Sequence, residues 1–375
     1  MEPFKNLLNP ALVQAAAGYL VRVYPHFPAQ AFVQQAQTGL ETLEMKARSL
    51  HICAALQAAL PARFEAAADV IEAALAPPEA SENVGSLQGL AAGLRGWILW
   101  PVGEFVAQRG LAQPERALQV LHALTQRFTA EFAIRPFIVQ HPALVFSTLA
   151  RWCHDKSHHV RRLVSEGSRP RLPWGLRLQA LVQDPTPTLP LLHALQNDPS
   201  DYVRRSVANH LNDIAKDHPN VLMQWLQDHL PDAPAARQAL LRHACRTLVK
   251  AGHPQVLQAW GLGTPFKGQA ALSTSPATLR LGGTVVLQMT LQSSSRHAQA
   301  LVVDYVVHHV KANGNTSAKV FKGWKLQLPA GGSLQLLKQH PVKPITTRSY
   351  HAGWHAVQVQ INGRVVAEAG FTLRL

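Results

Sequence analysis

A repeat inside the chain is the feature that most restricts how it can fold. Residues 154–170 (HDKSHHVRRLVSEGSRP) align with residues 197–213 (NDPSDYVRRSVANHLND) at an offset of 43 residues. An Asp, the run Val-Arg-Arg and a small residue recur at matching positions. This order is typical of the second helix of a HEAT-type hairpin, whose copies stack and bury one face against each other. The repeat therefore predicts an α-solenoid, in which residues 128–137 and 236–252 are weaker copies.

The sequence on either side of the repeat is also helical in character up to about Gly261. Ala, Leu, Glu, Gln and Lys are mixed with apolar residues near helical spacing in residues 11–23, 31–59 and 62–75. Clusters of Pro and Gly separate these segments, as expected at helix ends.

Beyond Gly261 the pattern changes to that of short strands. Ser, Thr, Gly and Val replace the earlier background, and apolar residues alternate with polar ones. Turn pairs lie between the alternating runs, namely Asn313-Gly314, Gly331-Gly332 and Asn362-Gly363. The clearest runs are residues 284–292, 301–310, 355–361 and 365–375. Six or seven such strands in about 110 residues predict a β-sandwich of immunoglobulin-like size.

The chain is therefore expected to be a multidomain all-α plus all-β protein. An α-solenoid of HEAT-like helical repeats occupies residues 1–262 in this prediction, and an immunoglobulin-like β-sandwich occupies residues 266–375.

Positive charge is concentrated in the last third of the chain. The whole sequence has 36 Lys and Arg against 22 Asp and Glu, a net charge of +14, and residues 261–375 contribute 12 basic and 2 acidic residues. Such a surface attracts polyanions, and nucleic acid is the commonest polyanion in a cytosol. The alternative is that the charge only keeps the protein soluble. Four lysines near the Asn313-Gly314 turn are candidates for phosphate contacts: Lys311, Lys319, Lys322 and Lys325.

Several classes of protein are disfavoured by what the sequence lacks. No run approaches 18 apolar residues, and the first residues do not resemble a secretion signal. The three cysteines and the scattered histidines have no metal-ligand spacing. We therefore expect a cytoplasmic protein with no membrane partner, no metal and no cofactor.

Three acidic residues lie among arginines at helical spacing, so each is predicted to share a helix face with them. The groups are Arg127, Glu131 and Arg135; Arg162, Glu166 and Arg169, provided that the helix continues past Gly167; and Arg205, Asn209 and Asp213. One interpretation is ordinary helical ion pairing, with Asp155 and Asp198 capping helices. Acidic residues repel DNA from a basic surface, however, so the three together favour a chemical role. Carboxylates can stabilise a developing positive charge or polarise a water molecule.

Trp174 stands in the stiff segment RPRLPWG, beside Arg169 and Arg171. Its indole could stack on a base or face a cation, or it could pack on the next helix. Four other tryptophans are expected in the core: Trp97, Trp152, Trp225 and Trp260.

In residues 128–137, 160–175 and 202–219 the chain resembles the AlkC family, bacterial DNA glycosylases built from HEAT-like repeats in the DNA alkylation repair superfamily. The resemblance covers almost the whole chain, including the immunoglobulin-like domain that some members carry. It implies monofunctional excision of cationic N3-alkylated bases, 3-methyladenine and 3-methylcytosine, from double-stranded DNA in base excision repair. The active-site residues that it implies are Glu131, Glu166, Asp213 and Trp174. The helical domain is therefore the predicted catalytic domain, and the β-sandwich, with its excess of basic residues, is the predicted DNA-binding domain.

Two functions stay open at the level of sequence. The first is this glycosylase, acting as a monomer on alkylated DNA of the nucleoid. The second is a non-catalytic HEAT-repeat scaffold that binds DNA structures or a protein partner by charge. Whether a base is flipped into a pocket also stays open. Six arginines of the repeats are candidate DNA-binding residues: Arg161, Arg162, Arg169, Arg171, Arg204 and Arg205.

Overall fold

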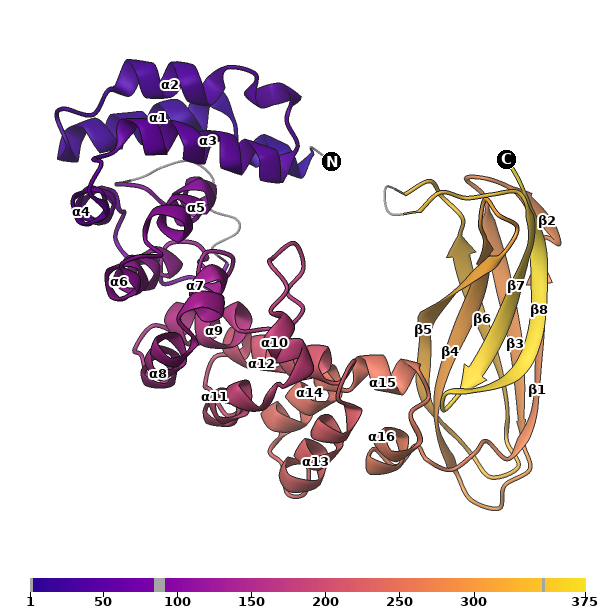
Figure 1. Cartoon of the computed structure of the whole chain (residues 1–375). Helices are drawn as coiled ribbons and strands as arrows, with labels where there is room; N and C mark the ends of the chain where they lie inside the picture. Colours follow the sequence, from indigo (N-terminus) through magenta and orange to yellow (C-terminus); the bar gives the residue numbers. More distant parts are fainter. Residues whose placement is uncertain (1–2, 84–91, 346–347) are drawn as a thin grey trace. The chain divides into compact units, whose positions relative to one another are not determined.

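The structure, a computed structural model, describes residues 3–83, 92–345 and 348–375 (Figure 1). Its α-helices are α1 (Pro10–Val23), α2 (Ala29–Gln37), α3 (Met45–Ala59), α4 (Phe64–Ala74), α5 (Leu99–Arg109), α6 (Pro114–Thr125), α7 (Arg135–Gln140), α8 (Pro142–Trp152), α9 (His158–Gly167), α10 (Gln179–Gln183), α11 (Leu189–Leu195), α12 (Asp201–Ile214), α13 (Pro219–His229), α14 (Ala235–Ala244), α15 (Arg246–Lys250) and α16 (Pro254–Ala259). The 3-10 helices are η1 (Phe4–Leu7), η2 (Leu40–Thr42), η4 (Gly96–Ile98) and η5 (Thr186–Thr188). The strands are β1 (Gly268–Ser275), β2 (Thr278–Arg280), β3 (Thr284–Ser293), β4 (Gln299–Val310), β5 (Thr316–Leu328), β6 (Ser333–Pro341), β7 (Gly353–Ile361) and β8 (Arg364–Arg374).

Helices followed by strands in this order confirm the predicted fold class. The chain divides into two compact units, and the division does not coincide with the change from helices to strands. The first unit comprises residues 1–217 and 233–244, and the second comprises residues 218–232 and 245–375. Helices α13, α15 and α16 therefore belong with the strands. No helix in the described part of the chain is long and apolar enough to cross a bilayer.

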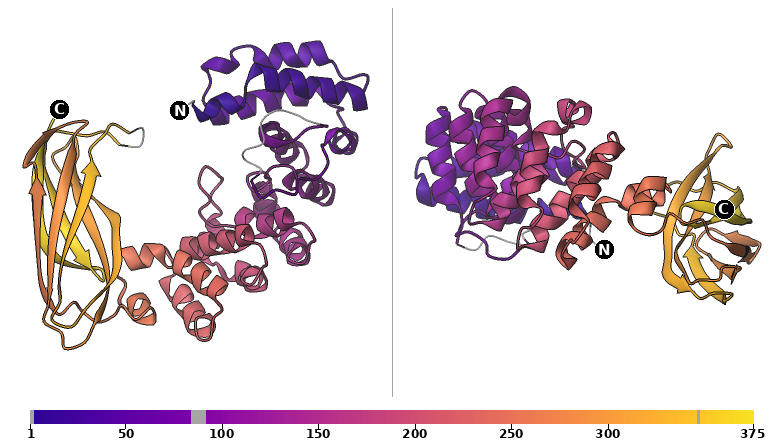
Figure 2. Two further views of the ribbon diagram at one scale, coloured as in Figure 1. Left: turned by 180° about the vertical axis from the view of Figure 1, so that it is seen from behind. Right: turned by 90° about the horizontal axis from the view of Figure 1, so that it is seen from below.

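The helices of the first unit stack in two rows, which can be followed in Figure 1 and in the left view of Figure 2. One row contains α4, α6, α8 and α11, and the other contains α5, α7, α9, α12 and α14. Helix α12 packs on α9 on one side and on α14 on the other. Residues at i, i+3 and i+4 spacing form the buried stripe of each helix. In α9 these are Val160, Leu163 and Val164, and in α12 they are Val203, Val207 and Leu211.

The predicted repeat is visible as two helical hairpins, α8–α9 and α11–α12. Helix α9 begins at His158 and α12 begins at Asp201, which reproduces the offset of 43 residues. The Val-Arg-Arg motif has the same role in both copies. Arg161 Nη1 donates to the carbonyls of Asp155 (2.8 Å) and Lys156 (3.0 Å). Arg204 Nη1 donates to those of Asp198 (2.6 Å) and Pro199 (2.8 Å).

One interaction also ties the first copy to the second. The Asp198 carboxylate accepts from Arg161 Nε at 2.6 Å and from Arg161 Nη2 at 3.0 Å. It also accepts from the backbone amide of Ser200 at 2.9 Å, just before α12 begins. Asp155 binds the amide of Ser157 in the same way. The two aspartates therefore order the loops before the helices, and the side chain that caps α12 is that of Ser200.

The helical segment predicted over residues 31–59 consists of more than one helix. Helix α2 ends at Gln37, η2 follows, and α3 begins at Met45. Gly39 has a φ of +74°, a left-handed conformation that glycine adopts without strain and that terminates a helix.

The strands form two sheets that face each other, as Figures 1 and 2 show. The order in one sheet is β1-β3-β6, and the order in the other is β2-β8-β7-β4-β5. Alternate residues of β3, β4 and β7 fill the core between the sheets, among them Leu287, Met289, Tyr305 and Val359. All three predicted turn pairs separate consecutive strands.

The turn between α15 and α16 touches the β7–β8 turn so closely that a Cβ on Gly252 would lie 2.7 Å from the carbonyl oxygen of Gly363.

Replacing Asp198 by Ala should destabilise the first unit. The Asp198 side chain is 3% exposed, so the substitution removes the buried carboxylate that Arg161 binds. We expect the free energy of unfolding to fall by about 3 kcal/mol, measured by urea denaturation of the full chain. Asp201→Ala is the control, because the Asp201 side chain is 67% exposed, and it should cost less than about 1 kcal/mol. Equal losses in the two variants would contradict the proposed link between repeats.

Candidate active site

Three buried carboxylates come from successive repeats, one from the turns between two helices and two from the last turn of a helix. Glu131 lies in the turns between α6 and α7, Glu166 in the last turn of α9, and Asp213 in the last turn of α12. Their exposed fractions are 6%, 6% and 1%. Buried acidic residues need partners, because an unpaired carboxylate loses its hydration without compensation. Their partners therefore determine what this site can do.

Arg169 joins two of these carboxylates. It follows α9 directly, and its Nη1 donates to Glu166 Oε1 at 2.6 Å. Its Nε and Nη2 each lie 2.8 Å from Asp213 Oδ2. Lys216 Nζ donates to the other oxygen of Asp213 at 2.8 Å, and Ser206 Oγ donates to Glu166 Oε2 at 2.6 Å. Asp213 and Glu166 are thus each held at both oxygens.

Arg162 continues the series of charges toward Glu131. Its Nη1 lies 3.3 Å from Glu131 Oε2, and its Nη2 lies 3.7 Å from Glu166 Oε1. Its guanidinium also lies over the ring of Tyr202, 5.2 Å from the ring centroid. We call the series Glu131, Arg162, Glu166, Arg169 and Asp213 the charge ladder.

The two glutamates of the charge ladder have opposite pKa shifts. Burial raises the pKa of Glu131, and the positive charge of Arg162 offsets only part of this effect. Burial would also raise the pKa of Glu166, but the charges of Arg162 and Arg169 outweigh it and lower the pKa. Glu131 Oε2 is buried, and its contact with Arg162 Nη1 is 3.3 Å long. Two contacts that hold Glu166 are each 2.6 Å long. Glu131 is thus held less tightly than Glu166.

Trp174 lies on a loop that projects from the helices between α9 and α10 (Figure 1). Its side chain is 69% exposed, and its φ of +64° is rare for any residue other than glycine. Arg135 fixes the loop, because its Nη1 donates to the carbonyl of Gly167 at 2.8 Å and its Nε donates to the carbonyl of Leu176. Burial lowers the pKa of Arg135 to about 10. The loop and the end of α9 are therefore held by one buried guanidinium.

Trp97 is half-buried rather than in the core as predicted. Its ring contacts Phe128, with centroids 4.9 Å apart, and the exposed Phe4 at the same distance. Trp225 is buried as predicted, whereas Trp152 and Trp260 are only half-buried.

The candidate DNA-binding arginines fall into four environments. Arg161 and Arg204 hold the loops of their own repeats, and Arg162 and Arg169 belong to the charge ladder. Arg171 pairs with Asp217 through two contacts of 2.6 Å. Arg205 projects into solvent with 68% of its side chain exposed, beside Asp201 at 3.6 Å.

The candidate lysines of the second unit are all exposed. Lys311 lies in the β4–β5 turn, and the other three lie on β5, which is an edge strand of its sheet. The register shifts at Gly323, where a Cβ would lie 2.3 Å from the carbonyl oxygen of Val303. Because of this bulge, Lys322 and Lys325 pair with Asp304 and Val302, two residues on the same face of β4.

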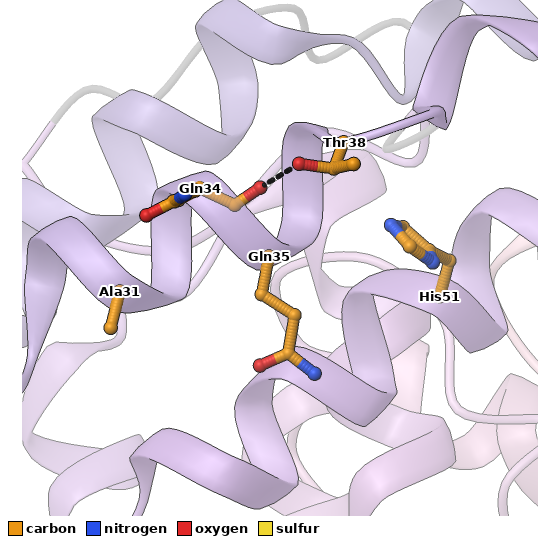
Figure 3. Close-up of a pocket in the computed structure, with 5 residues that line it drawn as sticks. All are labelled: Ala31, Gln34, Gln35, Thr38 and His51. Carbon is orange, nitrogen blue, oxygen red and sulfur yellow. Dashed lines mark hydrogen bonds between the residues drawn. The ribbon is translucent and has the colours of Figure 1, made fainter.

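A separate hollow lies beside α2 and α3 in the first unit (Figure 3). It is lined by Ala31, Gln34, Gln35, Thr38 and His51, and Thr38 Oγ1 donates to the Gln34 carbonyl at 2.7 Å. These residues include no carboxylate or thiol, so we assign it no chemistry. Among the described residues, no group of three or more His, Cys, Asp or Glu has the arrangement of a metal site.

Sequence reasoning identified the carboxylates but misplaced one of them. The prediction that Arg127, Glu131 and Arg135 share a helix face is wrong, because residues 126–134 form turns and α7 begins at Arg135. Pro136 explains this start, since proline favours the first turn of a helix and disfavours helix before it. Helix α9 ends at Gly167, yet Arg169 still reaches Glu166 from the following turn.

Several residues at this site had no recognisable pattern in the sequence. Ser206 and Tyr202 reach Glu166 and Arg162 from the next repeat, 40 residues further along the chain. Arg135 binds carbonyls that lie 32 and 41 residues away. Only the packing of successive repeats brings these groups together.

Two known proteins are similar to the chain over nearly its whole length. The uncharacterized protein YhaZ of Bacillus subtilis (strain 168) is 33% identical over 371 residues, which cover 97% of this chain and 98% of YhaZ. The solved structure of Pseudomonas fluorescens alkylpurine DNA glycosylase AlkC, bound to DNA containing an abasic site analog, matches with a TM-score of 0.87. It is 32% identical, and the match covers 100% of both chains. Residues 269–375 also match the family described as the YhaZ C-terminal Ig-like domain.

The opposite pKa shifts predict opposite effects of neutralising the two glutamates. At pH 8 the buried charge of Glu131 destabilises the native state, so Glu131→Gln should raise the melting temperature. This gain in melting temperature over wild type should shrink toward pH 5. The native pKa of Glu131 is raised, so in wild-type protein the native state takes up a proton at a higher pH than the unfolded chain does, and the cost of the buried charge disappears. Glu166→Gln should instead lose on the order of 2–3 kcal/mol of stability.

The loss in Glu166→Gln should persist at pH 5. A lowered native pKa keeps Glu166 ionised there, and its contribution disappears only as the pH falls further, through that native pKa. Melting curves of wild type, Glu131→Gln and Glu166→Gln between pH 5 and pH 8 test the predictions for both glutamates. A stability loss in Glu131→Gln that is larger at pH 8 than at pH 5 would contradict the assignment for Glu131.

Proposed function

The chain belongs to the AlkC family, and from this premise we propose that it is a monofunctional DNA glycosylase. Its proposed substrates are cationic N3-alkylated bases, 3-methyladenine and 3-methylcytosine, in double-stranded DNA during base excision repair. The observation that carries the proposal is the charge ladder, which keeps three buried carboxylates in place among arginines. The proposed enzyme acts as a monomer without a metal or cofactor.

The chemistry of a cationic base requires little acid catalysis. The alkylated base already carries positive charge and is a good leaving group, so the bond to deoxyribose breaks with positive charge developing on the sugar. Fixed carboxylates stabilise that charge most when they are already oriented. Glu166 and Asp213 suit this role, because each is held at both oxygens.

Glu131 suits a different role. A carboxylate with a raised pKa is a stronger base, and the contact of Glu131 Oε2 with Arg162 is comparatively long, at 3.3 Å. We therefore assign to Glu131 the orientation and deprotonation of the attacking water. Two acidic residues with opposite pKa shifts are a common division of labour in hydrolytic sites.

Trp174 is proposed to contact the cationic base or its sugar. Its exposed indole presents an electron-rich face, which attracts a cation. Arg135 holds the loop in a backbone conformation that is costly for tryptophan, and such strain is commonly found at functional sites.

The alternative function is a non-catalytic scaffold that binds DNA or a protein by charge. The glycosylase is favoured because a charge-based DNA binder gains nothing from three buried carboxylates. The relative of known structure also supports it, since that enzyme was solved with an abasic site analog, the state left after base excision. Release of free 3-methyladenine from methylated DNA by the purified protein distinguishes the two functions.

Neutralising one carboxylate should separate catalysis from binding. We expect Asp213→Asn or Glu166→Gln to lower the single-turnover excision rate by about 10²–10³-fold. Affinity for DNA should stay equal or improve, because negative charge is removed near a polyanion. Asp201→Asn is the matched control, since it makes the same charge change at an exposed position of α12. Near wild-type rates in both variants would refute the catalytic assignment.

DNA affinity should depend on the exposed basic residues of both units. Arg205→Ala should reduce the slope of log affinity against log salt by about one, and the double variant Lys322→Ala, Lys325→Ala by about two. The loss of affinity should be equal for damaged and undamaged DNA. Arg296→Ala, an exposed charge outside the candidate set, should leave the slope unchanged. A loss confined to damaged DNA would place these side chains at the lesion instead.

A further inference from the structure

Three aromatic side chains from distant parts of the chain meet at the surface of the first unit. Phe4 on η1 is 55% exposed and Trp174 is 69% exposed, and their ring centroids are 6.3 Å apart. Trp97 packs edge-on against Phe4, with an interplanar angle of 89°. Large aromatic side chains held together in water are costly to maintain, so such a patch indicates a binding surface.

The patch contacts the segment of the chain that carries Glu131. Trp97 packs on Phe128, and the neighbouring Trp100 stacks on Phe132 with centroids 5.2 Å apart. Phe128 and Phe132 lie in the same turns as Glu131, on either side of it in sequence. The aromatic surface and one end of the charge ladder are therefore built on the same segment.

Buried arginines hold the two backbone segments that carry the exposed rings. Arg48 is 3% exposed and anchors the η1 segment that carries Phe4, donating from Nη1 to the carbonyls of Lys5 at 3.0 Å and Leu8 at 2.9 Å. Its other nitrogens donate to the carbonyls of Glu41 and Leu43. Arg135 holds the Trp174 loop, as described above. A surface fixed in this way is preorganised and loses little conformational entropy on binding.

We propose that Phe4, Trp97 and Trp174 form an aromatic cradle that receives the cationic alkylated base, so that Phe4 and Trp97 are further base-contacting residues. Aromatic faces stack on any base, but they attract a cationic base more strongly. The cradle thus selects the alkylated base by its positive charge. The identity of this ligand rests on the proposed function.

A binding experiment tests the cradle separately from catalysis. The probe is a duplex with one 3-methylcytosine on 2′-fluoro-2′-deoxyribose, since the fluorine disfavours positive charge on the sugar and blocks cleavage. The same duplex with cytosine is the reference. The exposed Phe4 can be changed with little risk to folding, which a melting curve verifies. Phe4→Leu removes the π face at similar size, and Phe4→Tyr keeps it.

Wild-type protein and Phe4→Tyr should prefer the methylated duplex, and Phe4→Leu should lose about tenfold of that preference. Its affinity for the cytosine duplex should not change. The cradle is overturned if wild-type protein shows no preference, if Phe4→Leu binds both duplexes as wild-type does, or if it loses affinity for both equally.

The proposed function is judged separately, by release of free base from methylated DNA. If wild-type protein releases no base while Phe4→Leu loses the preference, the cradle stands and the glycosylase fails. If base is released at wild-type rates by Phe4→Leu and its preference is also unchanged, the glycosylase stands and the cradle fails.

Discussion

The pairing of Arg169 with Glu166 and Asp213 is the interaction on which the candidate site depends. Three charged groups are buried together there, and each would be costly to bury alone. Their geometry spans two consecutive repeats, so the way that α12 packs on α9 fixes the distance between the carboxylates. A solenoid is well suited to this task, because each repeat is positioned by its neighbour. The packing of α12 on α9 therefore both stabilises the stack and determines how far apart the charged groups of the site lie.

The arginines of the Val-Arg-Arg motif divide two tasks between them. In each copy the first arginine hydrogen-bonds the loop that precedes its own helix, and in the first copy it also reaches the aspartate of the next repeat. The second arginine is free to differ, and it does: Arg162 enters the charge ladder, whereas Arg205 extends into solvent. One motif thus holds the preceding loop in both copies and contributes to the charge ladder in only one of them.

The fold was predictable from the sequence to the extent that it follows from periodic patterns. The 43-residue offset and the alternation after Gly261 reflect spacings that burial imposes on helices and strands, so both were visible. Glu166 and Asp213 were found because they lie on the repeated helix. Arg48 and Phe4 were not, and Arg135 was assigned to a helix face with Glu131 instead of to its carbonyl partners, because these partners are carbonyls or rings from distant segments. No local pattern marks an arginine that binds backbone carbonyls, and the helix predicted around Glu131 failed at Pro136 for a purely local reason.

The division of the chain into two units has a consequence for how such proteins can change in evolution. The backbone passes between the units three times, between residues 217 and 218, 232 and 233, and 244 and 245. The strand-bearing unit therefore includes helices that lie outside the contiguous immunoglobulin-like segment of residues 269–375. A cut after Gly261 would separate the strands from α13, α15 and α16 and would strip Gly252 of its contact with Gly363. Gain or loss of the immunoglobulin-like domain in a lineage should consequently be accompanied by substitutions around Gly252, which packs against the β7–β8 turn.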